Sequence, residues 1–470
     1  MHALDTTVRF VSLAGAAAFV LGLHLMNSPA TARRGNQLSA VGMAAAVLAV
    51  AIGVGAGLHG AHMDLTRWVV LLAGIAVGGA WGLWTARTVA MTSMPQLVSL
   101  FNAVGGGAAA LIAIADYQHT PGMPAGTALA TTLDIVIGGT TFSGSLVAAA
   151  KLQGYWSQPV SFPGSRLAST VAAVAAVGLS AWVIGGAHSF GVLLGVVAAG
   201  LLFGVLMVLP IGGADMPVVI SLLNAFTGTA VAMAGFVLGN PILTIAGALV
   251  GASGGILTKL MADAMNRSVV NIIAGGFGTG ASGNVSAEAG SGGTVRSVAV
   301  DDAALQLAYA DKVIIVPGYG LAAAQAQHEC RELGEVLMSR GVDVTYAIHP
   351  VAGRMPGHMN VLLAEANVPY DLLKEMDEVN SEFDRADVAL VVGANDVTNP
   401  AARRPGNAVS GMPILDVDHA KSIIVIKRSM ASGYAGIDNE LYTNPKTSMF
   451  FADAKKGLAS LVAATKTLVG

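Results

Sequence analysis

Long apolar stretches fill most of the first 262 residues of the chain. A helix of about 20 apolar residues is long enough to cross the hydrocarbon core of a bilayer. The stretches predict nine membrane-spanning helices, at 6–26, 37–57, 67–86, 95–116, 128–150, 167–187, 190–210, 217–238 and 241–262. Glycine, alanine, serine and threonine are abundant inside them, which favours close packing of helices in lipid. We therefore expect the first part of the chain to form a polytopic all-α membrane bundle.

Charged side chains are concentrated in the second part of the chain. Residues 1–262 contain 13 Asp, Glu, Lys and Arg residues, and the remaining 208 residues contain 40. This division predicts lipid around the first part and water around the second. The formal net charge of −3 provides no basic stripe, which argues against a nucleic-acid partner. The single Cys330 can form neither an intrachain disulfide nor a cysteine zinc site, and we expect no metal site.

The positive charges predict the orientation of the bundle. Nine spans place the two termini on opposite sides of the membrane, and Lys and Arg favour cytoplasmic loops. Most of these residues fall on the side of the C-terminus, namely Arg33, Arg34, Arg87, Lys151, Arg166, Lys259 and Arg267. We therefore expect a cytoplasmic C-terminal domain and an N-terminus outside. Two arginines directly after the first span also argue against a cleaved signal peptide.

Four polar residues in or beside the spans are candidates for a hydrated polar path, because such groups are costly in lipid and often functional. Asp134 lies in the fifth span, either as a functional carboxylate or as a solvated group near the interface. Asp215 directly precedes the eighth span, where an aspartate can instead cap the helix. Asn102 and Asn224, in the fourth and eighth spans, are expected to face the interior of the bundle.

After a glycine-rich connector the pattern changes to alternating strands and helices. Strands are predicted at 312–316, 342–348, 388–392 and 423–426, and helices at 319–340 and 455–468. This alternation predicts an α/β Rossmann-like domain with a parallel sheet. The expected division of the chain is a transmembrane domain at 1–262, a flexible linker at 263–295 and a cytoplasmic domain at 296–470.

The first predicted strand leads into a glycine motif at Gly318-Tyr319-Gly320, which continues to Ala323. This is the G-x-G-x-x-A form of the dinucleotide fingerprint, placed after a strand and at a helix start, as the fingerprint requires. Its glycines let backbone amides approach a pyrophosphate at the positive end of the helix. The alternative is a tight structural turn.

Two further features favour NADP(H) over NAD(H). The acid that binds an NAD ribose normally ends the second strand, but this chain has His349 and Pro350 there. Lys427 and Arg428 follow a later strand, where two cations suit a 2′-phosphate. Solvated loop charges would give the same pattern. Arg354 is a candidate phosphate clamp.

Several longer segments together resemble one family, the β subunit of the proton-translocating NAD(P) transhydrogenases. The segments are 94–98, 141–145, 213–219, 223–224, 264–268, 317–327, 349–360, 392–399 and 426–436. The likeness covers nearly the whole chain. It implies an enzyme subunit that couples hydride transfer between NAD(H) and NADP(H) to inward proton translocation.

The resemblance also implies a set of site residues. Around the NADP(H) cofactor it places Gly318, Tyr319, Gly320, Arg354, Met355, Pro356, Gly393, Asn395 and Asp396. Lys427 and Arg428 would bind the 2′-phosphate, and Tyr434 would belong to a loop that closes over the nucleotide. Many family members carry a histidine in place of Asn102, and an amide cannot take up a proton near neutral pH. The proton carrier is then Asp134 or a histidine of a partner subunit.

The resemblance implies partners as well. An alpha subunit would carry the NAD(H)-binding domain and additional transmembrane helices, and a dimer of such assemblies would lie in the lipid of the bacterial inner membrane. Our own hypothesis is that protonation in the bundle reaches the cofactor through Asp215, the connector at 263–295 and the loop of Asp396, because these are the ionisable or flexible elements between the membrane and the cofactor. The alternative function is an ion transporter gated by a nucleotide-sensing cytoplasmic domain.

Overall fold

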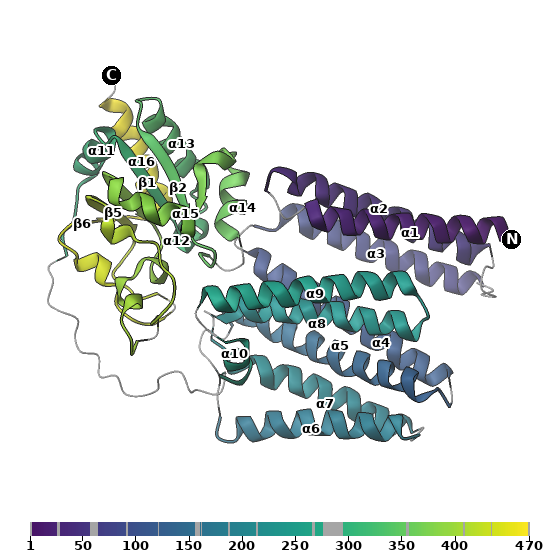
Figure 1. The fold of residues 1–470 in the computed structure, drawn as a ribbon. Coiled ribbons are helices and arrows are strands. Elements are labelled where there is room, and N and C mark those ends of the chain that lie inside the picture. Colours follow the sequence, from purple (N-terminus) through teal and green to yellow (C-terminus); the bar gives the residue numbers. More distant parts are fainter. Residues whose placement is uncertain are drawn as a thin grey trace. The chain divides into compact units, whose positions relative to one another are not determined.

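The computed structural model separates the chain into two compact units (Figure 1). They comprise Met1–Ala149, Gly164–Leu206 and Leu222–Gly255 on the one hand, and Ala150–Pro163, Met207–Ser221 and Ile256–Gly470 on the other. The structure describes residues 2–25, 29–56, 64–90, 93–120, 122–155, 160, 162–186, 189–212, 215–265, 268–275, 295–353, 357–407, 409–433 and 435–468.

Long apolar helices make up the first part of the chain. They are α1 His2–Leu25, α2 Pro29–Gly55, α3 Leu65–Thr88, α4 Met94–His119, α5 Ala125–Leu152, α6 Ser165–Ile184, α7 Phe190–Val208, α8 Met216–Val237 and α9 Pro241–Ala264. Among the described residues, eight helices, α2 to α9, are long and apolar enough to cross a membrane. The first predicted span corresponds to α1, whose apolar part, Thr6–Gly22, is shorter. The predicted membrane bundle is confirmed.

Glycine lets the backbones of neighbouring helices touch. A Cβ atom added to Gly228 of α8 would lie 2.3 Å from the backbone nitrogen of Gly251 in α9. One added to Gly138 of α5 would lie 2.5 Å from the carbonyl oxygen of Gly106 in α4. Real side chains do not fit at these distances, so both helix pairs depend on glycine at the contact.

A six-stranded parallel sheet forms the centre of the second part. Its strands are β1 Lys312–Pro317, β2 Asp343–Ile348, β3 Leu373–Glu375, β4 Val388–Val392, β5 Ser422–Lys427 and β6 Thr447–Phe451, in the order β3-β2-β1-β4-β5-β6. Every residue of β4 is buried, as expected for a strand covered on both faces. Ser297 makes a parallel bridge to Met449, so the chain pairs with the outer edge of β6 as it enters this domain.

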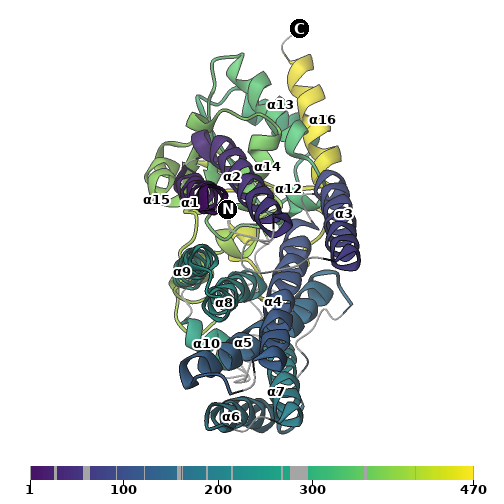
Figure 2. The ribbon, with the colours of Figure 1, turned by 90° about the vertical axis from the view of Figure 1, so that its right-hand side faces the viewer.

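Helices and short turns surround the sheet (Figure 2). The helices of this domain are α11 Val300–Ala308, α12 Tyr319–Ala323, α13 Gln327–Met338, α14 His358–Glu365, α15 Met376–Val379 and α16 Ala454–Thr467. One more short helix, α10 Val269–Gly275, precedes them in the chain. The 3-10 turns are η4 Tyr370–Leu372, η5 Asn380–Arg385, η6 Asp396–Thr398, η7 Pro400–Arg403, η8 Val417–His419 and η9 Glu440–Thr443. Both α11 and α13 pack against α16. The predicted Rossmann-like parallel sheet is confirmed.

The chain turns sharply where one helix over 319–340 was predicted. The structure breaks this segment into α12 and α13, with Gln325 at φ 50°. The amide of Ala326 donates to the carbonyl of Leu321, and the amide of Gln325 donates to that of Ala322. These two bonds form a Schellman motif, which ends a helix and usually has glycine at the left-handed position. Glutamine gave no such signal, so the prediction of one continuous helix was wrong.

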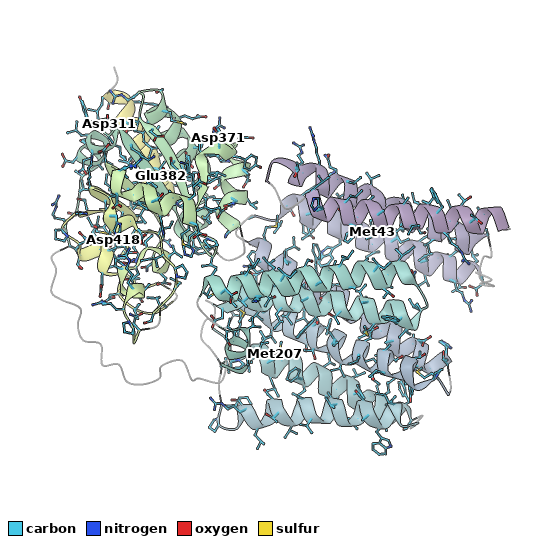
Figure 3. All side chains as sticks on the ribbon, viewed as in Figure 1. Met43, Met207, Asp311, Asp371, Glu382 and Asp418 are labelled. Atoms are coloured by element: carbon cyan, nitrogen blue, oxygen red, sulfur yellow. The ribbon has the colours of Figure 1, made fainter. Side chains whose placement is uncertain are left out.

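The half-buried carboxylate of Glu382 binds lysine side chains from two strands of the sheet. Glu382 of η5, labelled in Figure 3, accepts a bond of 2.6 Å from Lys312 at the start of β1. It also pairs with Lys374 of β3. Lys312 further contacts Asp343 at the start of β2, at 3.1 Å. The ion pairs therefore connect three strands, from the amino ends of β1 and β2 to the middle of β3.

The glycine contacts of the bundle can be tested by adding one methyl group. Gly228→Ala should destabilise the bundle by roughly 1–3 kcal/mol, because the new Cβ overlaps backbone atoms of α9. Thermal denaturation of the detergent-solubilised chain measures the effect. Gly78→Ala in α3 is the matched control, since no described atom lies within 4 Å of its added Cβ. Equal melting temperatures for the two variants would contradict the packing argument.

Candidate functional site

The order of the strands places a topological switch point at the carboxyl ends of β1 and β4, where doubly wound sheets form the crevice for their ligand. The chain continues from β1 to β2 on one side and from β4 to β5 on the other, and ligands of doubly wound sheets bind where the order reverses. Gly318, Tyr319 and Gly320 directly follow β1, and Gly393, Asn395 and Asp396 follow β4. The fold thus brings these predicted site residues to one edge of the sheet.

The loops after β1 and β4 touch through their backbones. Gly318 N donates to Val392 O at 2.9 Å, and Gly320 N donates to Gly393 O at the same distance. A Cβ on Gly318 would lie 2.3 Å from the Cα of Ala394, and Gly393 itself has φ 66°. Packing alone therefore requires these glycines, and their contact with a nucleotide stays a prediction.

Two side chains, from the cap residue of η9 and from η9 itself, bind the loop after β4. Asn439 Nδ2 donates to Asn395 O at 2.9 Å, and the Tyr442 hydroxyl donates to Ala394 O at 3.2 Å. Both side chains are buried. Asn439 and Tyr442 were not predicted from the sequence, because they belong to no motif and lie 44 and 48 residues beyond their partners.

Asp396 connects the loop after β4 to the segment near residue 434. Its Oδ2 atom accepts a bond of 3.1 Å from the amide of Ala435. A Cβ on Gly433 would lie 2.4 Å from Asp396 Oδ1. The carboxylate therefore approaches this segment so closely that only glycine fits at 433.

The two cations at the end of β5 have different surroundings. Lys427 is half-buried, donates to Ala431 O, and lies with its Nζ atom 4.7 Å from the centre of the Tyr442 ring. Burial lowers the pKa of Lys427, while the charges of Asp396 and Asp438 oppose that change. Arg428, the next residue, is exposed. Both residues lie at the same sheet edge as the glycine loops.

His349 occupies the end of β2, where an NAD-binding acid would normally lie. It is buried, and its Nδ1 atom accepts a bond of 3.2 Å from the amide of Val351. Its Nε2 atom therefore carries the proton and donates to Pro413 O at 2.8 Å. Burial lowers the pKa of His349 to about 4. His349 is therefore uncharged and links the loop after β2 to the segment of Pro413 through hydrogen bonds.

Five other residues were predicted to bind the cofactor. Ala323 is the exposed last residue of α12. Arg354, Met355, Pro356 and Tyr434 lie outside the described residues.

In the membrane part, Asn102 and Asn224 lie on neighbouring helices. Asn102 is buried on α4, and its carbonyl oxygen accepts a bond of 3.3 Å from the Thr227 hydroxyl of α8. Asn224 is half-buried one turn before Thr227 on the same helix. The two asparagines are thus at a similar level in the bundle. Asp215 lies at the start of α8, with its amide bonded to Gly212 O at 3.2 Å.

Asp134 lies at a different level of the bundle. Ser99 of α4 donates to Ser145 O of α5, and Gly106 meets Gly138, so these helices run in opposite directions. By this alignment Asp134 lies about 12 Å along α5 from the level of Asn102. It is fully buried, and neither carboxylate oxygen has a hydrogen-bond partner within the described part of the chain.

Lys151 has a structural role that charge counting did not reveal. The side chain is buried, and its Nζ atom donates to Val208 O at 3.3 Å and to Ile211 O at 2.8 Å. It also donates to Leu209 O. Val208 is the last residue of α7, so the ammonium binds carbonyls at the C-terminal end of this helix and just beyond it.

Known proteins resemble this chain over almost its full length. A family model described as NAD(P) transhydrogenase beta subunit matches residues 8–464. A protein of Rhodospirillum rubrum named NAD(P) transhydrogenase subunit beta is 47% identical over 458 residues, which cover 95% of this chain and 96% of the relative. A protein of the same name from a designated strain of that species has the same identity and coverage.

The neutral state of His349 predicts a local dependence on pH. An unfolded histidine has a pKa near 6.5, so between pH 6.5 and about 4 the unfolded chain binds more protons than the folded chain. The stability from this residue is present above pH 6.5 and decreases by about 3 kcal/mol as the pH falls to 4.

Hydrogen exchange of residues 343–353 and 409–415 at pH 7 and pH 5 measures this change. Exchange should indicate a larger loss of protection on acidification in the wild type than in His349→Gln, after correction for intrinsic rates. The amide of glutamine can donate to Pro413 O but does not titrate. An equal loss in both proteins would refute the role of His349.

Proposed function

Since the chain belongs to the NAD(P) transhydrogenase beta subunit family, we propose that its α/β domain binds NADP(H) and that an alpha subunit binds NAD(H). The chain is a membrane-embedded subunit of an NAD(P) transhydrogenase, and proton translocation is the general function of this family. Hydride transfer is the chemistry of the two nicotinamides. The protein supplies binding, orientation and exclusion of water.

The observation that carries the cofactor proposal is the register of β4 and β5. Val392 pairs with Ile426, so Gly393 and Lys427 are level at the carboxyl ends of adjacent strands. Parallel strands lie roughly 4.8 Å apart. A dinucleotide seated over Gly318, Gly320 and Gly393 then has a cation one strand away for its 2′-phosphate.

We assign the following roles within the proposed site. The turn from Gly318 to Ala323 contacts the dinucleotide together with Arg354, Met355 and Pro356. Lys427 and Arg428 bind the 2′-phosphate, since paired cations suit a dianion. The loop with Gly393, Asn395 and Asp396 lines the crevice, and Tyr434 belongs to the segment that closes over the nucleotide.

The proton path in this proposal uses the polar residues of the bundle. Asn102 and Asn224 form one level of it, and the unpaired carboxylate of Asp134 forms another. Because an amide cannot carry a proton, Asp134 or a histidine of the alpha subunit acts as the carrier. Asp215 and the connector at 263–295 pass the change to the cytoplasmic domain at 296–470.

The membrane potential is large enough to bias the reaction. A potential of about 150 mV supplies about 3.5 kcal/mol for one proton. This energy corresponds to a roughly 300-fold shift of the equilibrium toward NADPH. The proposal places the C-terminal domain in the cytoplasm of a bacterial cell, the N-terminus outside, and a dimer of alpha and beta assemblies in the inner membrane.

The coupling residue proposed near the cofactor is Asp396. Its carboxylate accepts the amide of Ala435 and thereby holds the segment that includes Gly433. Protonation removes the negative charge that strengthens this bond. The segment is then released more easily, which promotes exchange of NADP(H).

The assignment of the cations predicts the nucleotide preference. The detergent-solubilised chain should bind NADP⁺ more tightly than NAD⁺, and Lys427→Ala/Arg428→Ala should lose about 100-fold of that preference. Calorimetric titration with each nucleotide measures it. Lys421→Ala is the control. Lys421 directly precedes β5, at the end of the strand opposite to Lys427, and its Nζ atom lies 2.8 Å from Asp387 Oδ1. Equal binding of both nucleotides by the wild type would overturn the cofactor assignment.

The role of Asp396 predicts a change in pH dependence without loss of the site. Asp396→Asn should bind NADP⁺ within about tenfold of the wild type, but its dissociation constant should vary less between pH 5.5 and pH 8.5. Asp438→Asn also removes a carboxylate near Lys427 and should keep the wild-type pH profile. An unaltered profile in Asp396→Asn would exclude Asp396 as the coupling group.

A further inference from the structure

Tyr442 lies behind the proposed phosphate site and belongs to none of the motifs. Its side chain is 2% exposed and packs in the core of the α/β domain with Val391 of β4 and Val425 of β5. Buried tyrosines usually satisfy their hydroxyl group, and this one donates to Ala394 O at 3.2 Å. The hydroxyl therefore fixes the orientation of the ring.

The ring of Tyr442 meets the ammonium of Lys427. The Nζ atom lies 4.7 Å from the ring centre, within the distance of a cation–π interaction. A lysine has a long flexible stem, and its head group is not confined by its own geometry. Here the ring and the carbonyl of Ala431 confine it.

The neutral ring leaves the charge of Lys427 available. Asp396 and Asp438 both act on Lys427 electrostatically, and a direct ion pair with either would neutralise the ammonium before a ligand arrives. An aromatic face holds a cation without cancelling its net charge. The arrangement keeps a half-buried positive charge level with Gly393.

We propose that Tyr442 is a positioning residue for recognition of the 2′-phosphate, because its ring holds Lys427 toward the crevice while its hydroxyl ties the ring to the loop after β4. The inference rests on the proposed function, in which Lys427 binds that phosphate. Tyr442 then contributes to the preference for NADP(H) over NAD(H) without contacting either nucleotide.

The test measures the ratio of the dissociation constants of NAD⁺ and NADP⁺ for the detergent-solubilised full chain. Tyr442→Leu should lower this ratio about tenfold, whereas Tyr442→Phe, which keeps the ring, should stay within about threefold of the wild type. In the Lys427→Met background, Tyr442→Leu should cause no further change. Such non-additivity distinguishes an effect through Lys427 from a general loss of stability.

Tyr346→Leu is the matched control. Tyr346 is also buried and donates its hydroxyl to a backbone carbonyl, that of Cys330, at 3.4 Å. Its substitution removes a similar volume from the same domain and should leave the ratio unchanged. If Tyr442→Leu does not fold, trifluorophenylalanine at position 442 replaces it, since fluorination weakens the ring's attraction for a cation. That protein should have a lower ratio than Tyr442→Phe.

Each remaining outcome is decisive. An unchanged ratio in Tyr442→Leu, an equal loss of affinity for both nucleotides, or equal ratios for phenylalanine and trifluorophenylalanine would overturn the inference and leave the proposed function intact. A wild-type chain that binds NADP⁺ no better than NAD⁺ would overturn the proposed function itself.

Discussion

Contact between backbones without intervening side chains is the constraint on which both parts of this protein depend. In the bundle it joins α8 to α9 at Gly228 and Gly251, and α4 to α5 at Gly106 and Gly138. In the α/β domain it joins the loops after β1 and β4 at Gly318 and Gly393. In lipid the hydrophobic effect does little to drive helices together, so close van der Waals contact has to stabilise their association. In the sheet, the same close approach of backbones holds the loops after β1 and β4 together at one edge.

The elements that follow a simple period could be predicted from the sequence. Apolar stretches identified α2 to α9, and runs of β-branched residues identified β1, β2, β4 and β5. The three residues of β3 form no pattern, and β3 exists because β2 offers it an edge. Gln325 shows a second limit. Its left-handed conformation ends α12 early, and a glutamine does not predict such a conformation, as a glycine would.

Residues of the candidate site could be predicted where a suitable residue type follows a predicted strand. They could not be predicted where a residue acts by positioning another residue. Glycines after a strand and cations after a strand are visible in one sequence. The roles of Tyr442 and His349 are not visible, because their partners are backbone carbonyls far away in the chain. The level of Asp134 relative to Asn102 also depends on how α4 and α5 align, which Ser99 and Ser145 reveal only in three dimensions.

The bridge between Ser297 and Met449 has a mechanical consequence. Val298 N donates to Met449 O at 3.0 Å, and Met449 N donates to Arg296 O at 2.7 Å, so the chain enters the domain clamped along β6. Tension on the chain before Val295 loads these bonds together, in shear, rather than peeling them apart one by one. Because β6 pairs with β5 up to Lys427 and Phe451, the load passes first to the strand that ends at Lys427, the cation proposed to bind the 2′-phosphate.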